Sequence, residues 1–183
     1  MTALADIDPE ALGIAAAQAA GAVVASLAPK LGVRTEWDGS DDSKRAGRLM
    51  PLIRRLCLYA QTGERSRLAD PYATLTVAAS VLLSSPARPW RSEDLASLVV
   101  GHGPPESDLL HVLGCVLARL KIERGEAVSV AELAALASVT GQRVRQLVAA
   151  GEITATTGRG ATASTVTAGE ARRWLSSRGL SGY

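Results

Sequence analysis

The stretch 129-SVAELAALASVTGQRVRQLVAAG-151 decides the fold, because two apolar helical patterns are joined in it by a short Val-Thr-Gly. Ser129 and Glu132 form an S-x-x-E capping box, which predicts that a helix begins there. Thr140 can cap the second helix, and a final Gly ends it. The pattern fits two helices of a purely structural bundle, and it also fits a helix-turn-helix that reads DNA.

The second helix of this stretch has one apolar and one polar face. Counting 100° per residue from a buried Val144, Gln142 and Gln146 face away from the core, with Arg143 and Arg145 on either side of them. Glutamine can bind adenine through two hydrogen bonds, and arginine can bind guanine or phosphate. The helix N-terminus at Thr140 can present backbone N–H groups to a phosphate. These five residues are therefore candidate DNA contacts.

The chain changes character after residue 151. Residues 152–166 are rich in Thr around a central Gly158-Arg159-Gly160, which predicts two short strands and a turn. Thr167 and Glu170 form a second capping box, so a last helix is expected to begin there and to end at Gly179. The final four residues are expected to be frayed.

The pattern L-A-x-x-x-(small)-V-(S/T)-x-x-x-V-x-x-L, which runs from Leu133 to Leu147, resembles a helix-turn-helix. With the hairpin and last helix, residues 129–179 resemble the winged MerR-like or excisionase-like DNA-binding domains. The resemblance implies that the helix 140–150 enters the major groove and that a wing contacts the backbone or minor groove. By position it places Arg159 at the wing tip. It also implies that two arginines of the last helix, Arg172 and Arg173, meet phosphates.

Two residues depart from the pattern of the family that residues 129–179 resemble. Ser138 stands where Gly is most common, and Gly141 is expected to weaken the start of the reading helix. Residues 1–125 resemble no family. Their periodicity and N-cap signals predict helices at about 8–31, 42–61, 70–84, 92–100 and 106–123. Pro51 is expected to kink or divide the second of these helices.

The expected fold class is therefore mainly α. An N-terminal α-helical bundle, residues 1–125, is expected to mediate self-association or partner binding. A C-terminal winged helix-turn-helix with a short β-hairpin occupies residues 126–183. Composition agrees, since Ala, Leu and Val dominate the apolar residues and Phe is absent. Residues 11–28 lack charge but consist largely of Ala and Gly, so a buried helix is expected rather than a membrane span.

Few other kinds of chemistry are indicated. The chain shows no constellation of catalytic groups, no phosphate-binding loop and no cluster of metal ligands at the usual spacings, so no enzyme, cofactor or metal is expected. Cys57 and Cys115 stand in apolar helical patterns, which favours buried free thiols and a cytoplasmic location. Residues 120–183 carry 8 basic and 5 acidic side chains, and this net +3 suits a polyanionic partner.

These observations predict a sequence-specific double-stranded DNA-binding protein, either a transcriptional regulator or a phage or mobile-element control protein. One small domain of modest charge offers few phosphate contacts, so a homodimer that binds two half-sites is expected. The alternative is a non-enzymatic adaptor or subunit whose helix-turn-helix mediates protein–protein contacts.

Overall fold

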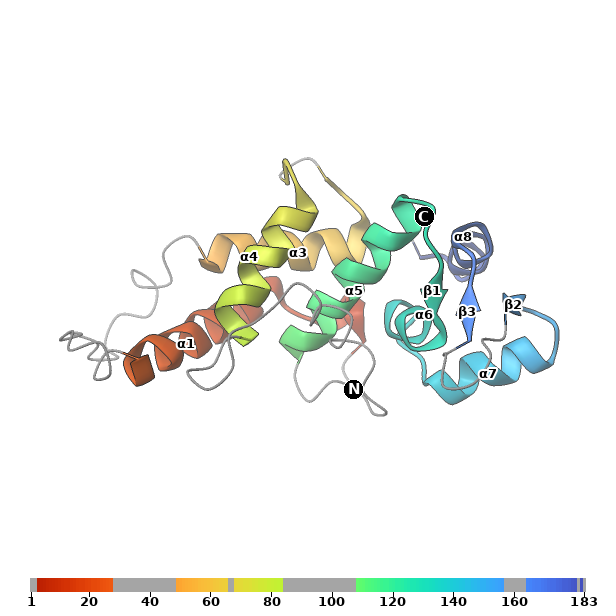
Figure 1. Ribbon diagram of the computed structural model, residues 1–183, viewed down its shortest axis with the longest axis horizontal. Coiled ribbons are helices and arrows are strands. Elements are labelled where there is room, and N and C mark those ends of the chain that lie inside the picture. The colour runs from red at the N-terminus through yellow and green to blue at the C-terminus, as the bar shows by residue number, and fades with distance from the viewer. Residues whose placement is uncertain are drawn as a thin grey trace.

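The protein is mainly α-helical with a small antiparallel sheet near one end (Figure 1). The computed structural model describes residues 3–27, 49–65, 68–83, 108–156, 164–180 and 182. In chain order its elements are η1 (Leu4–Asp6), α1 (Pro9–Leu27), α3 (Leu49–Thr62), α4 (Pro71–Leu83), α5 (Asp108–Glu123), β1 (Val128–Ser129), α6 (Val130–Leu136), α7 (Gly141–Ala149), β2 (Ala155–Thr156), β3 (Thr165–Val166) and α8 (Ala168–Ser177).

Two helices of the N-terminal half begin with the same local device. The Asp8 carboxylate accepts a hydrogen bond of 2.9 Å from the backbone N–H of Glu10 at the start of α1. At the start of α4, one oxygen of Asp70 accepts from Tyr72 N at 2.9 Å and from Ala73 N at 3.0 Å. In each case Pro occupies the first helical position, where no backbone N–H is needed. The starts predicted from Asp-Pro are confirmed.

From Leu49 to Thr62 α3 runs without a break, so Pro51 does not divide the described part of its helix. Pro51 is the third described residue of this helix. The expected helix at 92–100, the end of the first helix beyond residue 27 and residues 42–48 of the second lie outside the described residues.

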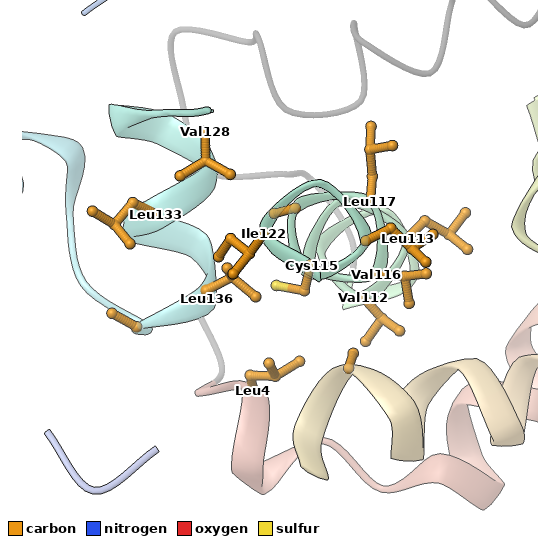
Figure 2. Packing of buried hydrophobic residues seen from close by; sticks show 14 of the residues in the cluster. Leu4, Val112, Leu113, Cys115, Val116, Leu117, Ile122, Val128, Leu133 and Leu136 are labelled. Carbon is orange, nitrogen blue, oxygen red and sulfur yellow. The ribbon is translucent and has the colours of Figure 1, made fainter. Parts of the chain in front are cut away.

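Helix α5 is the centre of the structure. Every residue from His111 to Leu120 is buried, since α5 contacts α3 and α4 on one side and α6, β1 and α8 on the other. Its Leu113 and Val116 pack toward the N-terminal helices, while Ile122 packs toward α6 (Figure 2). One hydrophobic cluster therefore runs from Leu4 to Leu175, across the expected domain boundary at residue 125.

The sheet has three strands in the order β1-β3-β2, all antiparallel. Val166 pairs with Val128 on one side and with Ala155 on the other. Strands β2 and β3 are the two that were predicted, and the segment 157–163 between them lies outside the described residues. Strand β1 was not predicted. It joins the start of α6 to the sheet, and Val130 N donates to Ser164 O at 3.2 Å.

Candidate nucleic-acid interface

The capping box at the start of α6 is fully formed. Ser129 Oγ accepts from Glu132 N at 3.2 Å, and Glu132 Oε2 accepts from Ser129 N at 2.7 Å. The other oxygen of this buried carboxylate accepts a hydrogen bond from Lys121 Nζ near the end of α5. The same Glu therefore fixes the start of α6 and ties α6 to the central helix.

The turn between α6 and α7 has the hydrogen bonds of a Schellman motif. Ser138 N donates to Ala135 O at 3.1 Å, and Val139 N donates to Ala134 O at 3.0 Å. Ser138 has a φ of +53° and is the one non-glycine among the described residues with a positive φ. This left-handed conformation costs a residue with a Cβ roughly 1–2 kcal/mol. The positive φ explains why glycine is most common at this position of the sequence pattern, where this chain has Ser138.

Helix α7 begins as expected, since Thr140 Oγ1 accepts from Arg143 N at 3.1 Å. Val144 and Leu147 are buried and hold the helix against the core. Gly141 stands at the first helical position, not in the interior of the helix. A Cβ added there would meet no other atom within 4 Å. Gly141 thus stands at the helix start, where the sequence predicts a weakness.

The opposite face of α7 carries the polar residues named from the helical wheel. Gln142, Arg143, Arg145 and Gln146 are all exposed. Within the part of the chain that the structure describes, none of their side chains makes a hydrogen bond or an ion pair with another residue. Helix α7 contains no acidic residue. This face, Gln142, Arg143, Arg145 and Gln146, is called the α7 polar face below.

The guanidinium groups of Arg172 and Arg173, unlike those of the α7 polar face, form hydrogen bonds within the fold. Arg172 Nη2 donates to the backbone oxygen of Ile122, and this bond ties α8 to the end of α5. Arg173 donates to both carboxylate oxygens of Glu170, and at 2.9 Å to the backbone oxygen of Glu152, which follows α7. Both guanidinium groups therefore hold elements of the fold together. Arg159, expected at the wing tip, lies outside the described residues.

The remaining cations of this third of the chain also have internal partners. Lys121 pairs with Glu132, Arg124 lies 4.7 Å from the ring centre of Tyr72, and Arg178 lies 5.2 Å from that of Trp174. Among the described residues from 120 onward, Arg143 and Arg145 are thus the two cations for which no partner lies within the described part of the chain. Both belong to the α7 polar face.

The second expected capping box forms only in part. Thr167 Oγ1 accepts from Glu170 N at 3.4 Å, but the Glu170 carboxylate bonds elsewhere. It accepts from Arg173 and from the backbone N–H of Thr154 just before β2, at 2.9 Å from the latter. These donors, Arg173 first, lower the pKa of Glu170 from 4.5 to about 2. The carboxylate thus fastens α8 to the base of the β2–β3 hairpin, a role that was not predicted because Thr154 lies 16 residues before Glu170.

The expected fraying of the last four residues does not extend to all of them. Leu180 packs on the core cluster and its N–H donates to Leu175 O at 3.2 Å. The backbone oxygen of Gly182 accepts at 2.8 Å from Arg119 of α5. A side chain at Gly182 would collide with the backbone oxygen of Thr62 at the end of α3. The described part of this tail is therefore docked between α3 and α5.

Comparisons with protein-family models, with curated proteins and with solved structures give no match for this chain. Within the described ranges, no helix combines the length and apolar character needed to cross a membrane. The same ranges bring together no group of three or more His, Cys, Asp or Glu side chains that could hold a metal ion.

Proposed function

We propose that this protein binds double-stranded DNA through the α7 polar face and acts as a sequence-specific regulator, either of transcription or of a phage or mobile element. The observation that carries the proposal is the distribution of cations. The described basic groups from residue 120 onward are engaged inside the fold except Arg143 and Arg145, which stand together on one exposed face with two glutamines.

The order of elements supports a winged helix-turn-helix. Helix α5, strand β1, helices α6 and α7 and the pair β2–β3 follow one another, and β1 completes the sheet beside β3. The tight turn at Ser138 joins α6 to α7, which pack against each other, and β2 and β3 follow α7 as an antiparallel pair, as the wing of such a domain would. With α5 as its first helix, the DNA-binding unit begins near residue 108 and shares that helix with the N-terminal bundle.

The chemistry of the α7 polar face fits the major groove. Nine helical residues extend for about 13 Å, which is enough to cross that groove. Gln142 and Gln146 are one turn apart, so each can reach a base edge and bind adenine through N6 and N7. Arg143 and Arg145 diverge to the two sides of this ridge, where the phosphates of the two strands lie. A protein-docking face would carry more apolar side chains at its centre.

A single α7, with the two arginines of its polar face, offers few phosphate contacts. We therefore expect a homodimer that places two α7 helices about one helical turn of DNA apart. Selection of bound fragments from random duplex DNA should then return a palindrome. A single half-site would support a monomer, and the absence of any enriched sequence would reject specific reading.

The salt dependence of binding tests the assignment residue by residue. The slope of log K against log salt falls by roughly 1 for each phosphate contact that is lost. Arg143→Ala or Arg145→Ala should reduce the slope by about that amount per protomer if the arginine meets a phosphate. Gln142→Ala or Gln146→Ala should relax the base preference and leave the slope unchanged.

Arg172→Ala is the matched control, because Arg172 is also exposed but its guanidinium bonds to the oxygen of Ile122. It should lower the stability of the fold and leave the salt slope of the folded protein unchanged. If the four α7 variants bind DNA like the unmodified chain, the proposed interface is wrong. If the unmodified chain ignores DNA and instead retains a protein partner that Arg145→Ala releases, the adaptor alternative replaces it.

A further inference from the structure

The short segment Leu4–Ile7, called the N-terminal strap here, lies between α3 and the turn that precedes α7. On the α3 side, the side-chain amide of Gln61 donates one hydrogen bond to Leu4 O at 2.9 Å and another to Ile7 O at 2.8 Å. On the other side, Leu4 N donates to Ser138 Oγ at 2.9 Å. The strap therefore connects α3 to the α6–α7 turn through hydrogen bonds at both of its edges.

The strap is also packed into the core. The side chains of Leu4 and Ile7 are both buried. Figure 2 shows Leu4 entering from η1 toward the space between α5 and α6, on the side of Cys115 and Leu136. Because protein interiors are close-packed, a shift of this side chain is transmitted to its neighbours.

The receiving end of the strap is a strained residue. Ser138 adopts φ +53°, where Gly would be free of strain, and a glycine there could not accept the bond from Leu4 N. Such a conformation persists where the surrounding structure enforces it. Serine is therefore less favourable than glycine for the backbone of this turn. Its hydroxyl, however, accepts the hydrogen bond from the strap.

We propose that the N-terminal strap positions the reading helix: Leu4 and Gln61 hold Ser138, and through it the α6–α7 turn, so that a displacement of α3 changes the DNA affinity of α7. The DNA part of this inference rests on the proposed function, while the mechanical link between Gln61 and the turn does not. It gives the N-terminal helices a role in setting the affinity of the α7 polar face.

The link is tested first without DNA, by amide hydrogen exchange of the full chain. Gln61→Ala removes the anchor on α3, and Ser138→Ala removes the acceptor while retaining the backbone restriction of a residue with a Cβ. Each loses hydrogen bonds worth about a 3- to 10-fold change in a local equilibrium. The hydrogen-bonded amides of this turn, those of Ser138, Val139, Arg143 and Val144, should exchange faster by about that factor in both variants. The double variant should be no faster than the faster single one.

Asp6→Ala is the matched control, because Asp6 lies in the same segment with an exposed side chain that bonds to no described residue. Its exchange should be unchanged. If Gln61→Ala leaves the hydrogen-bonded amides of the turn unaffected, or the two single effects add fully, the strap transmits nothing and the inference fails.

DNA affinity then separates positioning from direct contact. Under conditions where every variant is fully folded, Gln61→Ala and Ser138→Ala should weaken DNA binding by about 3- to 10-fold. The salt slope should not change, since neither residue contacts phosphate. An affected exchange with unchanged DNA affinity would refute the positioning role and leave the proposed function intact. If the unmodified chain does not bind DNA, the proposed function fails, and the exchange experiment still decides whether the link exists.

Discussion

Replacement of Glu170 by Gln should weaken the attachment of α8 to the β2–β3 hairpin in a pH-dependent manner. The carboxylate accepts from Thr154 N at 2.9 Å, from Arg173 Nη2 at 2.6 Å and from Arg173 Nε at 2.8 Å. A neutral glutamine amide keeps one acceptor oxygen but loses the negative charge that strengthens all three hydrogen bonds. The side chain of Glu170 is 15% exposed and that of Arg173 is 60% exposed, so water screens much of the interaction.

The size of this effect follows from the pKa. A fall from 4.5 to about 2 would correspond to roughly 3 kcal/mol for a fully shielded group. After reduction for solvent screening, we expect Glu170→Gln to cost about 1 kcal/mol near neutral pH. For a chain of this length, that lowers the melting temperature by about 2–4 °C.

The sign of the pH dependence is fixed, because the folded state lowers the pKa of Glu170. The stabilisation is complete above the unfolded pKa of 4.5 and is lost as the pH falls toward about 2. The difference between the two proteins should therefore shrink steadily as the pH falls from about 5 toward 2. Urea unfolding of both proteins across this range measures that difference directly.

Glu126→Gln is the matched control, since Glu126 is exposed and its carboxylate bonds to no described residue. It removes the same charge from the same third of the chain and should leave the difference near zero at every pH. A Glu170→Gln effect that is absent at neutral pH, or that stays constant down to about pH 3.5, would refute the reasoning.

Two further predictions concern stability and thiol chemistry. Gly141→Ala should raise the free energy of unfolding by about 0.4–1 kcal/mol in thermal or urea melts, because the added Cβ meets no atom within 4 Å and Gly141 is outside the left-handed region; a lower melting temperature would contradict this. Cys57 and Cys115 are fully buried, and burial raises the pKa of Cys57 to about 12 and that of Cys115 well above its usual range. A thiol reagent near neutral pH should therefore modify neither cysteine in the folded protein and both after unfolding, and rapid modification of the native chain would show that this core opens.

The features that the sequence predicted correctly depend on short-range interactions. The N-caps at Asp8, Asp70 and Thr140 bond to backbone groups two or three residues away, so their partners are visible in a short window. The buried face of α7 follows from helical periodicity alone. The left-handed residue at Ser138 was marked by its place in the pattern between the two helices.

The features that were missed depend on residues far apart in the chain. Strand β1 has only two residues, and its pairing with Val166 is set by how α5 and α6 pack around the hairpin. The bond from Leu4 to Ser138 joins residues 134 positions apart. Arg172 reaches a carbonyl 50 residues earlier, at the end of α5. No local pattern distinguishes such an arginine from one that faces a ligand.

This last distinction changes the electrostatic argument for DNA binding. The net +3 of residues 120–183 describes a whole segment, and most of its described cations are committed to carboxylates, carbonyl oxygens or aromatic rings of the same chain. The two ion pairs, Lys121 with Glu132 and Arg173 with Glu170, contribute little field at a distance because their opposite charges offset each other, while Arg124, Arg172 and Arg178 keep their charge but are held to rings or a carbonyl oxygen of the fold. The positive charge of Arg143 and Arg145 is instead concentrated on one exposed helix face. These arginines flank Gln142 and Gln146 on a helix without an acidic residue. The affinity of this site should therefore depend on these two arginines far more than on the net charge of the segment.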